Sequence, residues 1–501
     1  MPHVEVRPVS GALRGVWESD VAVFRGIPFA EPPVGARRFA APEPVRARDG
    51  VRDALSFGPP PPQAGVFGMD TLARDAGGDW LTVNVFSPAP DPGAGLPVMV
   101  WIQGGAYTIG MSGLPEWDGT RLARDGVVVV TFNYRVGIEG FARIEGAPAN
   151  RGLLDQVAAL EWVRDNIRAF GGDPDRVTVF GQSAGGGSVA ALLAMPRAAG
   201  LFRRAIAQSV QGTYFTAELA AEIATAFAAE LGLRPTVADL STVAPALLPA
   251  AGDAVTARIG QWAHRWGLAA HRTIPFSPVL DEDTLPVTPW QALADGAGHG
   301  VELLVGHTRD EQRLLTALDG LLGQVTPELA AAALDNLSPG PDGARRYREA
   351  FPSAGPAELY ELVNSDRLFR MPSLHLARAQ TTGGGRAFLY ELTWSAPGMG
   401  GVLGACHGLD VPLVFGNLDS GQPAMLIGEG PSPEAEALSG QMRAAWIAFA
   451  THGDPGWPAY DDGRRLTRVF DAGQAVTAYP EEASRLIWRD HIFPALPLTG
   501  S

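Results

Sequence analysis

Ser183 lies in the segment Gly181-Gln182-Ser183-Ala184-Gly185, which fits the pattern G-x-S-x-G. An apolar run at 177–180 precedes it and predicts a strand, and the residues from 186 to 195 predict a helix. In this strand-turn-helix context the pattern indicates a nucleophile elbow, a tight turn that exposes the serine hydroxyl at a helix N-terminus. The alternative interpretation is a glycine-rich helix start with an N-capping serine.

A second segment could bind the negative charge that develops when a serine attacks a carbonyl. The apolar run 97–102 predicts a buried strand that ends at Gly104-Gly105. Backbone N–H groups at such a strand end can form an oxyanion hole, together with the N–H of the residue after the nucleophile. We therefore expect Gly104, Gly105 and Ala184 to be the donors, although an ordinary glycine-rich turn would show the same pattern.

Several further motifs follow one another in a fixed order along most of the chain. They are 24–33 (FRGIPFAEPP), 79–85 (DWLTVNV), 133–137 (NYRVG), 171–174 (GGDP) and 180–186 (FGQSAGG). Together they resemble the type-B carboxylesterase family, which includes bacterial p-nitrobenzyl esterases and the cholinesterases. The resemblance implies a serine esterase with an α/β-hydrolase fold.

The resemblance also assigns an acid and a base. The segment 305–311 is similar to the family's G-x-x-x-D-E turn, which makes Glu311 the expected acid, and 404–410 is similar to the segment that carries the catalytic histidine, which makes His407 the expected base. Nucleophile, acid and base in this order are typical of α/β-hydrolases. We expect both residues in loops after strands. Asp310 remains an alternative acid, and His307, expected on a nearby surface loop, an alternative base.

Three positions depart from the family pattern. Gln103 stands where the family usually has His, Gln182 where it often has Glu, and Trp80 where many members have a disulfide cysteine. The first two are expected to alter groups that support the catalytic residues. Ser209 matches a serine that supports the triad in the family, although a serine at a helix end would look the same.

The pattern of strands and helices predicts the α/β class. Apolar strands alternate with helical segments such as 153–170, which indicates a large, mainly parallel central sheet with helices on both faces. Residues 217–260 and 324–380 are rich in helix formers and are expected to be inserted cap helices. No linker divides the chain, so we expect a single domain over residues 1–501.

The composition of the chain restricts the classes of partner and the cellular location that are expected for it. The formal net charge of −15 makes nucleic acid and anionic membrane surfaces unexpected partners. The 39 basic residues are all arginine, which suggests a GC-rich bacterial origin. The single cysteine, Cys406, permits no intramolecular disulfide, and no signal peptide or membrane span is visible, so a soluble, cytoplasmic monomer is expected. No metal-ligand spacing and no cofactor motif were found.

The expected reaction is hydrolysis of a small-molecule carboxylic ester, with short to medium acyl or aryl groups, through an acyl-enzyme. An amidase or carbamate hydrolase would use the same residues, and some relatives are non-catalytic binding proteins. Cholinesterases place an aromatic residue in the loop that corresponds to 58–79. That loop carries Phe67 and Met69 but no tryptophan, so choline esters are not expected.

Overall fold

The computed structural model describes residues 2–47, 49–64, 78–421, 423–428 and 430–500. In these residues the strands form one 13-stranded sheet. The strands are β1 (His3–Val6), β2 (Ala12–Glu18), β3 (Val21–Pro28), β4 (Val51–Asp53), β5 (Thr82–Ser87), β6 (Leu96–Ile102), β7 (Val128–Phe132), β8 (Gly172–Gln182), β9 (Arg204–Gln208), β10 (Glu302–Thr308), β11 (Ala387–Leu392), β12 (Leu466–Phe470) and β13 (Gln474–Ala478).

The sheet runs in the order β1-β2-β3-β5-β7-β6-β8-β9-β10-β11-β12-β13, with β4 beside β2. Every neighbouring pair from β7 through β12 is parallel, whereas β1, β2, β3 and β5 at one edge and β13 at the other pair antiparallel. The predicted mainly parallel sheet is therefore confirmed, with antiparallel margins.

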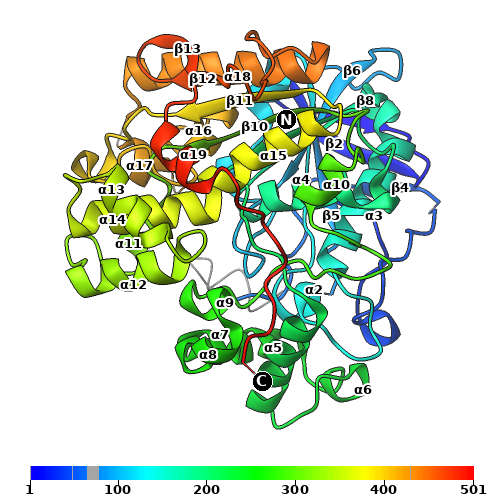
Figure 1. The fold of residues 1–501 in the computed structure, drawn as a ribbon. Helices are drawn as coiled ribbons and strands as arrows, with labels where there is room; N and C mark the ends of the chain where they lie inside the picture. The colour runs from blue at the N-terminus through cyan, green and yellow to red at the C-terminus, as the bar shows by residue number, and fades with distance from the viewer. Residues whose placement is uncertain (1, 48, 65–77, 422, 429, 501) are drawn as a thin grey trace.

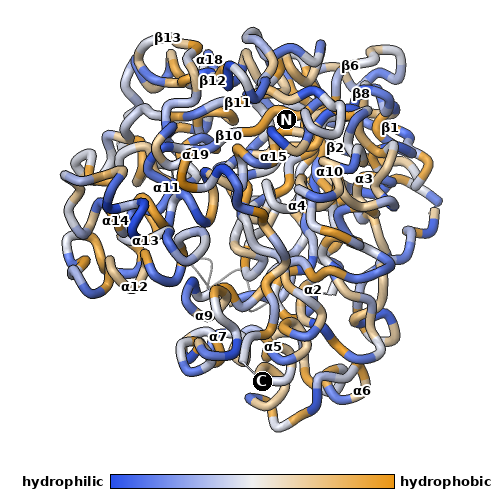
Figure 2. The backbone as a smooth tube through the Cα atoms, viewed as in Figure 1, coloured by the Kyte–Doolittle hydropathy of each residue, from blue (hydrophilic) through white to orange (hydrophobic). Residues whose placement is uncertain are grey.

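Both faces of the central strands are buried. Along β6, Val98, Val100 and Ile102 enter one hydrophobic cluster, while Met99 and Trp101 enter the other. Figure 2 shows this apolar character along β10 and hydrophilic colour along the outer helix α13. A strand buried on both faces reads as a continuous apolar run, which is why these strands were recognisable in the sequence.

Helices cover each face. The first cluster takes residues from α3 (Arg151–Asn166), α4 (Ala184–Ala194), α10 (Pro289–Ala294) and α15 (Met371–Thr382), and the second from α1 (Thr120–Arg124), α16 (Asp410–Phe415) and α18 (Pro433–His452). The predicted helix over 153–170 is α3 followed by a 3-10 turn, and Gly171 in the left-handed region (φ 87°) ends it. The two-sided covering of the sheet was predicted and is confirmed.

Two helical groups lie beside the sheet (Figure 1). The first comprises α5 (Ala217–Glu230), α6 (Val237–Leu240), α7 (Leu248–Ala257), α8 (Ala263–Trp266) and α9 (Leu268–His271). The second comprises α11 (Glu311–Leu318), α12 (Pro327–Leu337), α13 (Gly343–Ala350) and α14 (Pro356–Ser365). The remaining helices are α2 (Gly137–Phe141), α17 (Pro423–Ile427) and α19 (Glu482–Trp488). In the part of the chain described, no helix has the length and apolar character needed to span a bilayer.

Candidate active site

Ser183 occupies the turn between β8 and α4, with φ 60° and ψ −123°. A side chain in such a sparsely populated region costs of order 1–3 kcal/mol and persists only where the surroundings impose it. Here the Ser183 N–H donates to the carbonyl oxygen of Gln208 (3.0 Å), and its carbonyl accepts from the N–H of Gly187 (2.8 Å). A Cβ on Gly185 would lie 2.0 Å from the carbonyl oxygen of Ile102, so the turn admits only glycine there. The expected strand-turn-helix context is present.

His407 and Glu311 are 96 residues apart in sequence and in direct contact. The Nδ1 atom of His407 lies 2.5 Å from Oε2 of Glu311. The other oxygen, Oε1, accepts from the hydroxyl of Ser209 (2.6 Å) and from the N–H of Thr308 (2.9 Å). The sequence pattern predicted Glu311 in a loop after a strand, but it is the first residue of α11, where the helix N-terminus also favours a negative charge.

Glu311 is fully buried, and its surroundings keep it ionised. Burial alone would raise the pKa of its carboxyl, but the neighbouring His407 charge and the hydrogen bonds from His407 and Ser209 lower it further than burial raises it. The net pKa is below the ordinary value. A carboxylate at this position accepts the N–H of Nδ1 and so leaves Nε2 of a neutral imidazole as the acceptor.

Asp310, the alternative acid, has other partners. Its Oδ2 accepts from the N–H of Ala405 (2.8 Å), and its carboxylate pairs with Arg309 (3.2 Å) and Arg313 (3.3 Å). The Asp310 N–H in turn donates to the Ala405 carbonyl oxygen (2.9 Å). Asp310 thus holds the backbone at Ala405, two residues before His407, in place. Among the described hydrogen bonds, it makes none to the imidazole.

The expectation that His307 lies on a surface loop was wrong. It is a fully buried residue of β10, because that strand lies between β9 and β11 inside the sheet. Its Nε2 lies 2.9 Å from the hydroxyl of Tyr479, and its Nδ1 lies 3.0 Å from the carbonyl oxygen of Thr308. Burial, aided by the charge of Arg370, lowers the pKa of His307 to about 4. Both ring nitrogens are therefore engaged away from Ser183.

The Nε2 side of His407 faces Gln182, whose Nε2 lies 3.1 Å away. Gln182 is buried, and the position of a Cβ on Gly104 would lie 3.3 Å from its Oε1 and 3.1 Å from Cβ of Ser183. Gln182 and Ser183 therefore both adjoin Gly104, and Gln182 connects this corner of the site to the imidazole.

Phe369 covers one face of the His407 ring, with ring centroids 4.2 Å apart and planes at 32°. It lies in a short π-helical stretch, 366–370, between α14 and α15. Sequence analysis missed this residue, because nothing in its local pattern links it to His407. A π-helical turn in a helix is often found at functional sites, but it leaves no clear signature in a single sequence.

Of the expected oxyanion donors, Ala184 directly follows Ser183, and Gly104 lies beside it, since an added Cβ on Gly104 would be 3.1 Å from Cβ of Ser183. Among the hydrogen bonds of the described residues, none uses the N–H groups of Gly104, Gly105 or Ala184. Gly105 has φ 115°, and a Cβ there would lie 2.2 Å from the carbonyl oxygen of Ile109, so the turn requires glycine. These free donors beside a serine could bind an oxyanion.

Gln103 precedes the donors and is fully buried. Within the described residues neither polar atom of its side-chain amide has a hydrogen-bond partner. Its backbone carbonyl oxygen accepts from the hydroxyl of Tyr134 (2.7 Å), which fixes the chain just before the two glycines. The side chain packs toward Gly110, where an added Cβ would lie 3.1 Å from Cγ of Gln103.

Asp410 is a second buried carboxyl near the candidate triad and was not singled out in the sequence. Its Oδ2 accepts from the amide of Gln208 (2.9 Å) and the hydroxyl of Tyr390 (2.9 Å). Burial raises its pKa to about 6, and the charge of Glu311 acts in the same direction. The proximity of this second carboxyl follows from α16 starting three residues after His407.

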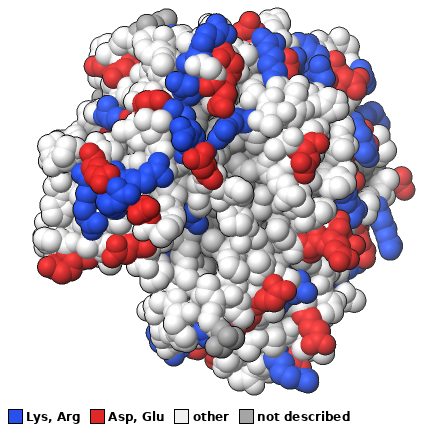
Figure 3. All heavy atoms as spheres, in the orientation of Figure 1, with Lys and Arg blue, Asp and Glu red and all other residues white. Residues whose placement is uncertain are grey.

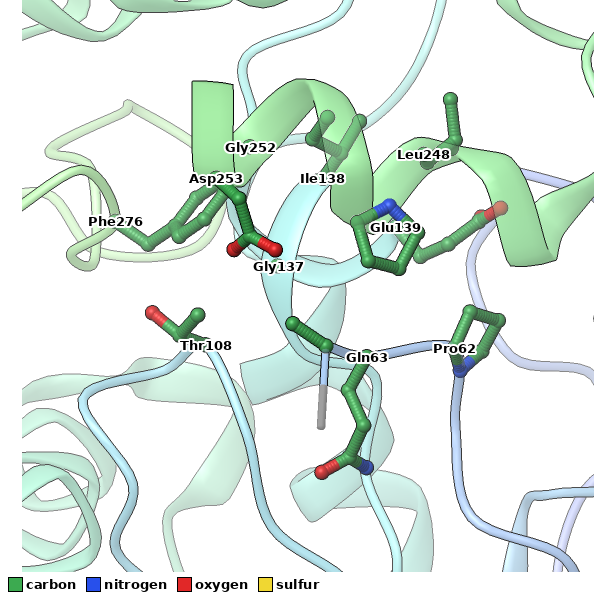
Figure 4. A pocket seen from close by; sticks show the side chains of 12 residues that line it. Pro62, Gln63, Thr108, Gly137, Ile138, Glu139, Leu248, Gly252, Asp253 and Phe276 are labelled. Carbon is green, nitrogen blue, oxygen red and sulfur yellow. The ribbon is translucent and has the colours of Figure 1, made fainter. Parts of the chain in front are cut away.

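A small pocket lies beyond the glycine turn (Figure 4). Apolar side chains of Ile138, Leu248 and Phe276 line it, and the carboxylate of Asp253 faces it. Thr108 connects the pocket to the candidate oxyanion donors, because its N–H donates to the carbonyl oxygen of Gly105 (2.9 Å). Phe67 and Met69, from which we argued against choline esters, lie outside the described residues.

Among the residues that the structure describes, no group of three or more His, Cys, Asp or Glu side chains could hold a metal ion. Cys406, beside His407, is buried, and burial raises the pKa of its thiol to about 12, so it stays protonated.

Three comparisons with known proteins all match this chain to esterases. A family model described as the carboxylesterase family matches residues 2–330. The chain is 40% identical over 499 residues to the para-nitrobenzyl esterase of Bacillus subtilis (strain 168), covering 97% of this chain and 98% of that protein. It is 36% identical over 476 residues to the fumonisin B1 esterase of Sphingopyxis macrogoltabida, covering 90% and 84%. The crystal structure of a Geobacillus stearothermophilus carboxylesterase matches with a TM-score of 0.85 and 37% identity, covering 97% and 99%.

Proposed function

Because the chain belongs to the carboxylesterase family, has the α/β-hydrolase fold and is a carboxylic ester hydrolase, we propose that Ser183, His407 and Glu311 are its nucleophile, general base and supporting acid. The observation that carries this assignment is the chain of contacts from Glu311 through His407 to the corner occupied by Gln182 and Ser183. Residues 311 and 407 are distant in sequence, and their contact supports a shared role.

The proposed reaction has two halves. His407 Nε2 accepts the hydroxyl proton of Ser183 while the serine oxygen attacks the ester carbonyl carbon. The imidazolium then gives that proton to the leaving alcohol, which leaves an acyl-serine. Water attacks the acyl group with His407 again as the base, and Ser183 is released. Glu311 stabilises the imidazolium in both halves.

The oxyanion formed in each half needs donors. We assign this role to the N–H groups of Gly104, Gly105 and Ala184, which are free of other partners among the described residues. Removing one such donor typically costs about 10²–10³ in kcat. Ser209 supports the triad by donating to the Glu311 oxygen that His407 does not use.

The substrates in this proposal are small-molecule esters with short to medium acyl or aryl groups. The apolar lining that Ile138, Leu248 and Phe276 give to the pocket near Thr108 supports this choice. We further propose that residues 217–260 and 324–380 act as cap elements of a single domain, and that the protein is a cytoplasmic monomer, in keeping with its one unpaired cysteine.

A chain-length series tests this substrate class. Para-nitrophenyl esters of increasing acyl length are compared with para-nitroanilides of the same acyl groups. We expect kcat/KM to be highest for short to medium esters and at least 10³-fold lower for the matched anilides. Comparable rates on the anilides would make the protein an amidase with the same catalytic residues, and no turnover of any ester would favour a binding protein.

A further inference from the structure

The acceptor nitrogen of His407 is already occupied in the free protein. A neutral imidazole has one N–H and one lone pair in the ring plane. The Glu311 carboxylate can only accept, so the N–H is on Nδ1 and the lone pair on Nε2. Gln182 Nε2, 3.1 Å from that atom, is then a donor to it. Among the described hydrogen bonds, none joins His407 Nε2 to the hydroxyl of Ser183.

We propose that Gln182 is a positioning residue that holds the Nε2 lone pair of His407 in the free enzyme and competes with Ser183 for it. This inference rests on the proposed triad. The Gln182–His407 hydrogen bond must open before the serine proton moves to Nε2, because a single lone pair accepts a strong hydrogen bond from only one donor at a time. In the transfer itself, the Ser183 O–H bond breaks and its proton joins Nε2, while the serine oxygen forms the new bond to the carbonyl carbon and the carbonyl π electron pair moves onto the carbonyl oxygen.

The packing around Gln182 explains why the contact is maintained. The side chain is buried between two glycines, and an added Cβ would lie 3.3 Å from its Oε1 at Gly104 and 3.8 Å from its Nε2 at Gly408. Phe369 lies over the His407 ring and Glu311 fixes its other nitrogen. Neither partner can turn freely, so the hydrogen bond between the Gln182 amide and His407 is maintained in the free protein.

The neutrality of Gln182 matters as much as its position. Two carboxyls already act on the imidazole, Glu311 directly and Asp410 from α16. Asp310 lies close by but is paired with Arg309 and Arg313. An amide donates to the neutral ring and adds no charge. A carboxylate at 182 could only accept, and so would bind and stabilise the protonated ring instead.

The first test is the pH dependence of kcat/KM in the parent, Gln182→Glu and Gln312→Glu. Gln312 is a matched control, since it is buried directly after Glu311 but accepts from Arg272 (2.9 Å) and not from His407. We expect the acid limb of Gln182→Glu to move up by one pH unit or more and that of Gln312→Glu to stay in place. A smaller movement in Gln182→Glu, or an equal movement in both variants, overturns the proposal.

The second test uses Gln182→Met, which keeps the side-chain length but removes the donor, and so remains informative if Gln182→Glu does not fold. The rate at which an organophosphate modifies Ser183 in substrate-free enzyme is measured at alkaline pH, where the base is neutral. We expect Gln182→Met to react at least threefold faster than the parent. An equal or slower rate overturns the role of Gln182, whereas a parent that is not modified at Ser183 overturns the proposed triad itself.

Discussion

Glu311 accepts three hydrogen bonds in a fully buried position, from His407, Ser209 and Thr308. Such a set satisfies both carboxylate oxygens and offsets the cost of burying the charge. It also fixes which nitrogen of His407 carries the proton. The position of the proton on His407 therefore depends on the negative charge of residue 311 and on the fact that a carboxylate can only accept hydrogen bonds.

Replacing Glu311 by Gln tests that dependence. The amide keeps the shape but removes the charge, and its NH₂ must face either the Nδ1–H of His407 or the donors Ser209 and Thr308. We expect kcat to fall by two to four orders of magnitude, in line with losses of a triad carboxylate elsewhere. Asp310→Asn should cost less than tenfold, because Oδ1 of the new amide can still accept from Ala405. If Asp310→Asn is the more damaging change in steady-state assays, the supporting acid is Asp310.

The acid limb of the pH profile is a second residue-scale prediction. We expect log kcat/KM to fall with unit slope on the acid side, because one proton on His407 removes the base. The lowered pKa of Glu311 keeps it ionised while this happens, and His307, with its pKa lowered to about 4, takes up its proton only in stronger acid. His307→Ala should keep the limb, and His407→Ala should lose nearly all activity. Loss of the limb in His307→Ala would show that the base was misassigned.

At the level of elements, the parallel strands bring the candidate residues to one edge of the sheet. Ser183 follows β8, the glycine turn follows β6, and Glu311 follows β10. Carboxyl ends of parallel strands meet at the same edge, where α/β proteins place their ligands. Each turn then needs a backbone shape that only particular residues allow.

Two glycines test the claim that each turn needs a particular backbone conformation, because one of them can be replaced by alanine without strain and the other cannot. Gly252 lies inside α7 with ordinary helical geometry, and an added Cβ would meet Phe276 at 3.7 Å, a normal contact. Gly252→Ala should therefore stabilise the protein by about 0.5–1 kcal/mol. Gly105→Ala should destabilise it by more than about 1 kcal/mol, because φ is 115° and the Cβ would overlap the Ile109 carbonyl oxygen. Urea unfolding measures both, and a stabilising Gly105→Ala would contradict the turn.

Local patterns predicted the elements around Ser183 better than those around His307. The buried strand, the elbow and α3 are visible because apolar residues and glycines follow local spacing. His307 was misread because its burial comes from pairing of β10 with β9 and β11, not from its own neighbours in sequence. Phe369 could not be found for the same reason, because its contact with His407 joins distant segments. Asp410 lies only three residues after His407, but its burial and its contacts with Gln208 and Tyr390 come from distant segments.

For the whole molecule, the α/β class, the mainly parallel sheet and its covered faces followed from the sequence, and the esterase activity followed from the family resemblance. The match of the para-nitrobenzyl esterase over 97% of this chain supports both. The net charge of −15 is spread over a surface on which Arg and acidic residues are interspersed on the face shown in Figure 3.

The most direct test of the central claim is mass spectrometry of the intact protein and its peptides after inactivation by an organophosphate ester. A serine activated by a neighbouring base reacts with phosphorus electrophiles. The account predicts one adduct per chain, on Ser183, formed in step with the loss of esterase activity and absent in Ser183→Ala. An inactivated enzyme whose adduct lies on another residue, with Ser183 unmodified, would contradict it.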